Sequence, residues 1–321
     1  MNEIAIASQK TAVIEVKDLL DNTVDKFLAS IDTKERTKET YRKSLRVFQI
    51  WVTDNNYTPL ERRHLLEYKQ YLQDKTIVDT DGEIKNLSSL TVSAYLTALR
   101  RFFAFLESEK IYPNIAKDIK GLKRPKGFLK DTLTKDEVKR LLEGIIEDDL
   151  NALRDFAMIN LMIRTGLRTI EVSRANIGDI GRESGETVLR VWGKGRDSKD
   201  DFVILTERAY KPILDYFQKR GEAGLQEPLF TSHSNRNIKE PITTRSIRRI
   251  IETRLKAVGL KTKRVTAHSL RHTAGTIALL NGADILGVKE MLRHSNINTT
   301  LTYAHNLNRI SKGAEKHIDF D

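Results

Sequence analysis

The chain has 321 residues, enough for two domains of ordinary size that each bury their own apolar core. Lysine and arginine total 55 against 44 acidic residues, and the formal charge of +11 favours a polyanionic partner over a small neutral substrate. Because the chain has no cysteine, disulfides, thiolate nucleophiles and cysteine-based metal sites are excluded. The sequence contains neither a signal-peptide pattern nor an apolar run that could span a bilayer, so we expect a cytoplasmic protein with no membrane partner.

Helical periodicity dominates the first part of the chain. Four segments space their apolar residues as amphipathic helices do: residues 19–30, 34–53, 62–75 and 89–108. No strand-like alternation accompanies them. They predict an all-helical bundle over residues 19–122, preceded by an N-terminal tail of residues 1–18.

A basic segment that breaks the helical period follows the bundle. The string "KGLKRPKGFLK" contains proline and glycine and carries five positive charges with no negative one. We interpret residues 123–131 as a linker that lies along nucleic-acid phosphates; the alternative is a solvated loop. The residues expected at the phosphates are Lys123, Arg124 and Lys126.

The predicted second domain covers residues 132–305, and a C-terminal tail of residues 306–321 follows it. Thr134 and Glu137 form a capping-box pattern, which predicts that this domain begins with a helix. Helical patterns then dominate, with one interruption by strand-like segments. The expected fold class is therefore mainly α with a small antiparallel β-sheet, an α+β architecture.

The interruption has the pattern of a β-hairpin. Residues 187–192 and 202–205 are rich in strand-forming side chains, and the segment between them is rich in glycine, lysine and aspartate. This pattern predicts two antiparallel strands joined by a long loop. The basic residues expected on this loop include Lys194 and Arg196.

A second basic cluster occupies residues 245–264. It contains eight basic residues and one acid, Glu252, whereas a solvated helix normally mixes both signs. The pattern favours a surface that faces phosphates. The residues expected on this surface are Arg245, Arg248 and Arg249.

His268, Arg271 and His272 stand together at the start of a predicted helix capped by Thr266. His268 and Arg271 share a face, where backbone amides, the helix dipole and both side chains favour a bound anionic oxygen. Zinc is the competing interpretation, because His268 and His272 lie four residues apart. However, the glutamate of the metalloprotease motif is missing, and Arg271 would place a positive charge beside the ion. We interpret His272 as a packed, hydrogen-bonded structural histidine.

Two weaker signals lie on either side of this helix in the sequence. Gly166 permits a turn before a helix that carries Arg168 and Glu171, three residues apart, and the alternative is a surface ion pair. A later helix ends at His294, and Tyr303 follows nine residues further on. The alternative for that tyrosine is an amphipathic surface residue.

Taken in order, these residues resemble the catalytic set of the tyrosine recombinase (phage integrase) family. The matching strings are "TGLRTIEV", "GKG", "HSLRH" and "HSNINTTLTY", which hold Arg168, Glu171, Lys194, His268, Arg271, His294 and Tyr303. The helical bundle resembles the family's core-binding domain, and the two-domain organisation resembles Xer-type resolvases and mobile-element integrases. One departure is Arg293, because the family often has glycine before the last histidine.

The resemblance assigns phosphate binding to three of these residues. Arg168 and Arg271 would hold the non-bridging oxygens of the scissile phosphate, since guanidinium groups suit such oxygens. His294 would donate a hydrogen bond to the same group. Glu171 would orient Arg168 or His268.

The remaining residues would perform the covalent chemistry. Tyr303 would attack phosphorus to form a 3′-phosphotyrosyl intermediate, while His268 accepts its proton and Lys194 protonates the leaving 5′-hydroxyl. The covalent bond stores the energy for religation, so neither ATP nor any other cofactor is implied. The acids of the chain are scattered rather than clustered, which makes a metal-dependent nuclease a poor fit.

The resemblance further implies duplex DNA at specific recombination sites as the partner, clamped by the two domains. It implies a homotetramer in the synaptic complex, in which the tail of residues 306–321 packs into a neighbouring protomer; the alternative is that this tail folds back on its own domain. Two other functions stay open. One is a type IB topoisomerase-like enzyme that relaxes DNA as a monomer, and the other is a non-catalytic DNA-binding regulator with the same fold.

Overall fold

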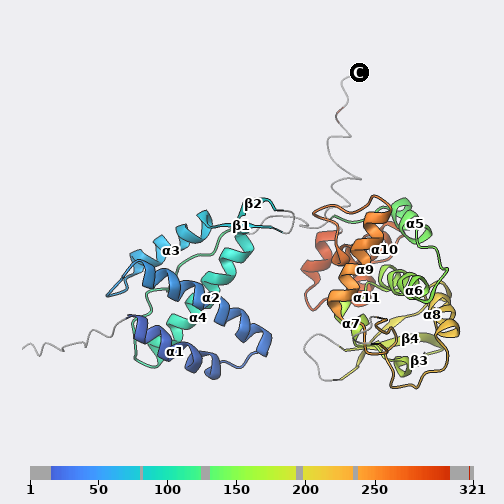
Figure 1. The fold of residues 1–321 in the computed structure, drawn as a ribbon, viewed down its shortest axis with the longest axis horizontal. Helices are drawn as coiled ribbons and strands as arrows, with labels where there is room; N and C mark the ends of the chain where they lie inside the picture. Colours follow the sequence, from blue (N-terminus) through green and yellow to red (C-terminus); the bar gives the residue numbers. More distant parts are fainter. Residues whose placement is uncertain are drawn as a thin grey trace, which may run out of the picture. The chain divides into compact units, whose positions relative to one another are not determined.

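The computed structural model describes residues 16–79, 82–123, 131–192, 198–233, 238–303 and 318. The chain divides into two compact units, residues 1–126 and 127–321 (Figure 1). Within the described residues, no helix is both long and apolar enough to cross a bilayer.

The described part of the N-terminal unit is mainly helical. Its helices are α1 (Val16–Ser30), α2 (Glu35–Asp54), α3 (Arg62–Asp74) and α4 (Ser89–Ser108). The start of α4 follows from its cap, because the hydroxyl of Ser88 accepts the backbone N–H of Thr91. The apolar stripe of α4 is buried and contacts α1, α2 and α3, and its Phe102 ring meets Phe27 edge-on at 5.6 Å. The helices predicted for this region are confirmed.

A small hairpin corrects the prediction of an all-helical bundle. Strands β1 (Thr76–Val78) and β2 (Ile84–Asn86) pair antiparallel between α3 and α4. Every residue of both strands is exposed. The prediction failed because strands this short, with neither face buried, leave no alternation of apolar and polar residues in the sequence.

The described part of the C-terminal unit is helical around one small sheet. Its elements are α5 (Lys135–Glu143), α6 (Leu150–Thr165), α7 (Thr169–Ser173), β3 (Ile180–Glu183), β4 (Glu186–Val191), β5 (Asp201–Ile204), α8 (Glu207–Arg220), α9 (Thr244–Ala257), α10 (Ala267–Leu280) and α11 (Ile285–Met291). The capping box of Thr134 and Glu137 forms as predicted and starts α5. The expected fold class, mainly α with a small antiparallel sheet, is confirmed.

The predicted hairpin is present, and a third strand extends it. β4 and β5 pair with Val191 opposite Asp201, and β3 adds to the other edge of β4. The sequence did not indicate β3, because its four residues include glycine and two charged side chains rather than a strand-like run. The hairpin loop begins after β4, and Lys194 and Arg196 on it lie outside the described residues.

Helix α6 is the centre of this unit, and in Figure 1 it lies between α10 and α8. Its residues from Ala157 to Ile163 are all buried, so the helix is enclosed on every side. Helix α10 packs on α6, and Arg271 in its second turn reaches the carbonyl of Gly166 at the C-terminal end of α6. That junction is where the candidate site forms.

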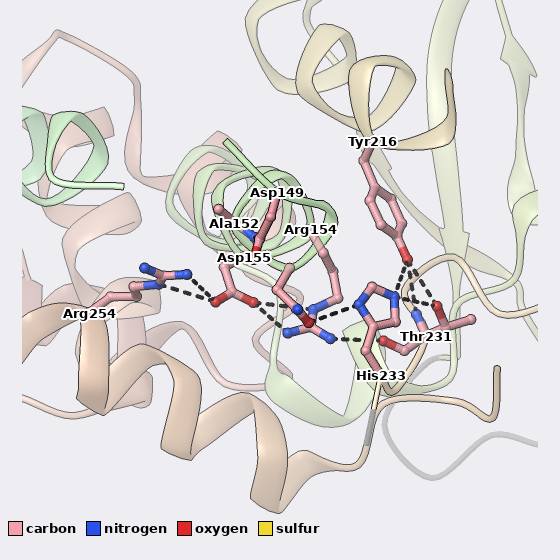
Figure 2. A network of polar contacts seen from close by, with 9 residues as sticks. Asp149, Ala152, Arg154, Asp155, Tyr216, Thr231, His233 and Arg254 are labelled. Carbon is pink, nitrogen blue, oxygen red and sulfur yellow. Dashed lines mark hydrogen bonds and ion pairs between the residues drawn. The ribbon is translucent and has the colours of Figure 1, made fainter. Parts of the chain in front are cut away.

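A buried polar network ties α6 to α9 (Figure 2). The carboxylate of Asp155 lies between two guanidinium groups, with Oδ1 and Oδ2 accepting from Arg154 and Arg254 at 2.7 Å each. Arg154 also donates to the carbonyl of Thr231, and His233 bonds to the hydroxyl of that residue at 3.2 Å. Each guanidinium in this network therefore has the carboxylate as partner, which holds α9 in place against the core.

Candidate active site

The end of α6 sets the position of Arg168. Gly166 ends the helix in the left-handed conformation, with φ +64°, and a Cβ there would come within 2.4 Å of Leu292 Cδ2. Only glycine fits both the backbone angle and this close approach. Arg168 follows as the N-cap of α7 rather than as a residue inside the helix, because Oε2 of Glu171 accepts its backbone N–H at 2.7 Å.

Arg271 reaches the same place from α10. Its Nη1 donates to the carbonyl of Gly166 at 2.6 Å and its Nη2 donates to the carbonyl of Leu292. The Nη2 of Arg168 lies 3.4 Å from the next carbonyl, that of Arg293. Carbonyl groups at a helix end lack partners within the helix, so the end of α11 attracts both cations. Arg168 and Arg271 are 103 residues apart in the sequence. In the structure they reach the carbonyls of two consecutive residues, Arg293 and Leu292.

Glu171 is enclosed by two guanidinium groups. Its Oε1 accepts from Nη1 of Arg168 at 2.6 Å, and its Oε2 accepts from Nη2 of Arg293 at 2.7 Å. Burial acts to raise the pKa of Glu171, but Arg293 and then Arg168 outweigh it, so the pKa lies below its usual range and the group is anionic. The ion pair between Arg168 and Glu171 is present, but it is not the exposed surface pair of the alternative, because Glu171 is only 5% exposed.

The site carries excess positive charge. Arg271 is 2% exposed and, within the described ranges, forms no ion pair with a carboxylate. Burial, followed by the neighbouring charge of Arg168, lowers the pKa of Arg271 to about 9. Of the three guanidinium groups at the site, those of Arg168 and Arg293 contact Glu171, whereas that of Arg271 contacts no carboxylate of the described residues. A cluster with such an excess of positive charge favours an anionic ligand.

Tyr303 is buried beside these cations. The residue is 1% exposed, and its phenol hydroxyl is hydrogen-bonded to Nδ1 of His272 at 2.6 Å. Burial raises the pKa of Tyr303 to about 12, although Arg271 and Arg168 act in the opposite direction. The alternative of an amphipathic surface tyrosine is therefore wrong.

His294 follows α11 and lies against Tyr303. Its Nδ1 is hydrogen-bonded to the hydroxyl of Thr300 at 2.9 Å, and its ring stacks on Tyr303 with centroids 6.1 Å apart. Burial, followed by the charge of Arg271, lowers the pKa of His294 to about 4. The ring is neutral at pH 7; in the tautomer in which Nδ1 accepts from Thr300, its other nitrogen carries the proton and can donate one hydrogen bond.

His268 and His272 occupy the first turns of α10. His268 is exposed, and its ring meets His272 edge-on at 4.5 Å. His272 is packed and hydrogen-bonded, and burial, followed by His268 and Arg271, lowers its pKa to about 3. Sequence reasoning missed that its partner is Tyr303, since nothing in the spacing links two residues 31 positions apart.

The predicted catalytic residue Lys194 and three of the predicted DNA-contact residues lie outside the described part of the chain: Arg124, Lys126 and Arg196. Lys123 is described and exposed. Lys199, also on the hairpin loop, binds both carboxylate oxygens of Asp179 at 2.6 and 2.7 Å. Its ammonium group is therefore held at a structural ion pair.

The basic cluster of residues 245–264, which covers α9 and the segment after it, divides into two groups. Arg254 binds Asp155 and Arg264 lies 3.0 Å from Asp131, so the cluster faces more acids than Glu252, which corrects the sequence interpretation. Carboxylates distant in the sequence could not be counted from the local pattern. The other group is exposed and forms no ion pair within the described ranges: Arg245, Arg248 and Arg249.

Comparisons with known proteins identify relatives of this chain. The family model described as phage integrase family matches residues 131–309. Tyrosine recombinase XerC of Thermodesulfovibrio yellowstonii is 32% identical over 230 residues, covering 69% of this chain and 73% of the relative. Tyrosine recombinase XerD of Staphylococcus epidermidis is 31% identical over 270 residues, covering 78% and 88%.

Solved structures show the same fold. A XerH site-specific recombinase, bound to palindromic difH substrate in a post-cleavage complex, superposes with a TM-score of 0.70 at 23% identity, covering 93% of this chain and 85% of that one. A lambda integrase dimer bound to a COC′ core site gives a TM-score of 0.66 at 17% identity, covering 89% and 97%. The family resemblance seen in the four sequence strings is confirmed. The chain belongs to the phage integrase family and is a tyrosine-type site-specific DNA recombinase.

Proposed function

We propose that this recombinase cuts and rejoins duplex DNA through a 3′-phosphotyrosyl intermediate on Tyr303. The observation that carries the proposal is the buried guanidinium of Arg271, which lies beside Arg168 and forms no ion pair with a carboxylate in the described part of the chain. A buried cation without a counterion is unfavourable, and a scissile phosphate would supply the missing negative charge.

Arg168 and Arg271 bind the two non-bridging oxygens in this proposal. A guanidinium group has five N–H donors, and the contacts of each side chain with the described residues use only part of them. The free donors are available to the phosphate without breaking the bonds that position the side chains. His294 donates the hydrogen bond of its free ring nitrogen to the same oxygens as negative charge develops.

Tyr303 is the nucleophile, and its phenol must leave His272 before it attacks. With the pKa of Tyr303 near 12 and that of His272 near 3, proton transfer between them is strongly unfavourable in the arrangement observed. We assign the proton acceptor to His268, which is exposed at the start of α10. The P–O5′ bond breaks as the phosphotyrosyl bond forms, and the leaving oxygen takes a proton from Lys194.

Basic side chains on both units provide the non-specific part of DNA binding. The exposed arginines of α9 are suited to phosphate contact because the described residues offer them no carboxylate. We assign phosphate contacts to Lys123, Arg124, Lys126, Arg196, Arg245, Arg248 and Arg249. Affinity should then fall steeply with increasing salt concentration.

The larger assembly is part of the proposal. Residues 19–122 form the core-binding domain, residues 123–131 the basic linker and residues 132–305 the catalytic domain. Four protomers exchange strands between two duplexes in the cytoplasm, and residues 306–321 pack on a neighbouring protomer. The solved relatives bound to difH or core-site DNA support DNA as the partner.

The test is covalent trapping. A randomised library of nicked duplexes is incubated with the protein, and DNA that stays attached in denaturant is sequenced to obtain the recombination site. We expect wild-type protein to form this adduct and Tyr303→Phe to bind the same duplex without forming it. Absence of any adduct would leave the non-catalytic regulator, whereas relaxation of supercoiled DNA by a monomer without a specific site would favour the topoisomerase-like alternative.

A further inference from the structure

Arg293 is an unusual residue in an unusual conformation. It follows the C-cap of α11 and has φ +51°, in the left-handed region that favours glycine. Its side chain is nevertheless long, charged and only 4% exposed. A strained backbone that persists at a candidate site indicates that the side chain makes contacts that hold it there.

Besides donating its backbone N–H to the carbonyl of Glu290, Arg293 makes three contacts at the candidate site. Nη2 donates to Oε2 of Glu171 at 2.7 Å, and Nη1 donates back to the carbonyl of Met291 at 2.7 Å. Its own carbonyl lies 3.4 Å from Nη2 of Arg168. Arg293 is therefore linked to Arg168 in two ways. Both guanidinium groups bind the carboxylate of Glu171, and the backbone carbonyl of Arg293 lies near the guanidinium of Arg168.

The carboxylate between them transmits this contact. Glu171 uses Oε1 for the guanidinium of Arg168 and Oε2 for that of Arg293. Without Arg293, Oε2 would keep only the backbone N–H of Arg168, and the carboxylate could rotate. The guanidinium of Arg168, whose side chain is 26% exposed, would then lose its fixed direction.

We propose that Arg293 is a positioning residue for strand cleavage, which fixes Glu171 and through it directs the guanidinium of Arg168 toward the scissile phosphate. The inference rests on the proposed function of Arg168. It predicts a defect in cleavage that is separate from DNA binding and from folding, because Arg293 acts on the direction of one phosphate ligand.

Arg293→Gly is the main test variant. Glycine removes the guanidinium and accepts φ +51° without strain, so a defect cannot be attributed to the backbone. Lys239→Gly is the matched control, since Lys239 is an exposed cation at φ +68° in the same unit. Arg293→Lys keeps a positive charge beside Glu171 but cannot hold both oxygen partners in the same geometry.

The measurements are single-turnover cleavage of the nicked duplex, DNA affinity and the midpoint of thermal unfolding. For Arg293→Gly we expect cleavage about 10- to 100-fold slower at unchanged DNA affinity, with Arg293→Lys in between and Lys239→Gly like the wild type. Wild-type cleavage by Arg293→Gly would overturn the inference. So would parallel losses of affinity, cleavage and thermal midpoint in both Arg293 variants, which would indicate a merely structural role.

A double-mutant cycle separates this inference from the proposed function. If Arg293 acts through Arg168, adding Arg293→Gly to Arg168→Lys should slow cleavage little further, whereas multiplicative effects would mean that the two residues act independently and would overturn the inference. Failure of the wild-type protein to form any adduct would contradict the proposed function itself. The two failures are thus distinguishable.

Discussion

The C-terminal unit buries two clusters of charged side chains, and they differ in how their guanidinium groups are paired. In the network between α6 and α9, both guanidinium groups contact the carboxylate of Asp155. In the cluster around the end of α11, Arg168 and Arg293 share Glu171, while Arg271 binds only carbonyl oxygens among the described residues. A cluster in which every guanidinium has a carboxylate partner stabilises the fold. A cluster in which one guanidinium lacks such a partner can bind an anionic ligand.

The N-terminal unit strengthens this contrast. In its described part the buried polar residues are Thr23, Ser44 and His64, and the carboxylate of Asp79, whose side chain is 8% exposed, pairs with Lys85 at 2.9 Å. Its core consists of apolar and aromatic side chains. Among the described residues, the arginines that are buried, Arg154 and Arg271, both lie in the C-terminal unit, so buried guanidinium groups distinguish that unit.

Removal of the carboxylate from the complete network should have the largest effect on stability. Asp155→Ala leaves Arg154 and Arg254 without their shared anion, and loss of one member of a buried ion pair costs about 3–5 kcal/mol. Denaturant unfolding measures the change. A loss under about 1 kcal/mol would show that the network is not what holds α9 against α6.

Removal of the unpaired cation should instead affect cleavage. Arg271→Met deletes two hydrogen bonds to backbone carbonyls but also an uncompensated buried charge, so we expect a stability loss under about 2 kcal/mol. Cleavage of the nicked duplex should fall about 100- to 1,000-fold, as for loss of an oxyanion donor. Equal destabilisation by Arg271→Met and Asp155→Ala would contradict the distinction between the clusters.

An inorganic anion should bind at the cluster that has an unpaired guanidinium and should stabilise the folded protein there. Sulfate bound between Arg168 and Arg271 would stabilise the folded protein by about 1.4 kcal/mol at ten times its Kd. Thermal unfolding in sulfate and in chloride at equal ionic strength gives the measurement. Arg271→Met should lose the stabilisation that comes from the bound sulfate but keep the general stabilisation that sulfate gives to any folded protein. An equal rise of the thermal midpoint in the wild type and in Arg271→Met would argue against an anion site.

The smallest effect should appear in the response to acid. Burial lowers the pKa of His272 to about 3 and that of His294 to about 4, both below the unfolded value near 6.5. Between the folded and unfolded pKa values, the unfolded chain binds protons at these histidines that the folded protein does not bind. The contribution of these histidines to the free energy of unfolding is therefore fully present above about pH 6.5 and falls as the pH drops. We expect each histidine to contribute a loss on the order of 1 kcal/mol between pH 6.5 and 5. In His272→Gln and His294→Gln this part of the acid response should be reduced, and an unchanged pH profile would show that these groups do not titrate as inferred.

Much of the site could be predicted because its signals are local. Caps and turns act over three or four residues, which is why Thr134 and Glu137 marked the start of α5, and why Gly166 marked the turn before Arg168. The order of the four strings then indicated the family and the candidate residues. The assignments of Lys194, Arg196, Arg124 and Lys126 stay predictions, since these residues lie outside the described part of the chain.

The sequence alone determined the helices, the hairpin that carries Lys194 and the membership of a family, because each depends on short-range periodicity or on short strings of residues. Only the tertiary structure decided which buried charges find a partner. The contact of Arg293 with Glu171 spans 122 residues and that of Tyr303 with His272 spans 31, and no pattern along the chain fixes such distances. Packing of α10 against α6 and of α11 against α10 brings these groups together. Packing decides their partners because burial removes the water that would otherwise satisfy them.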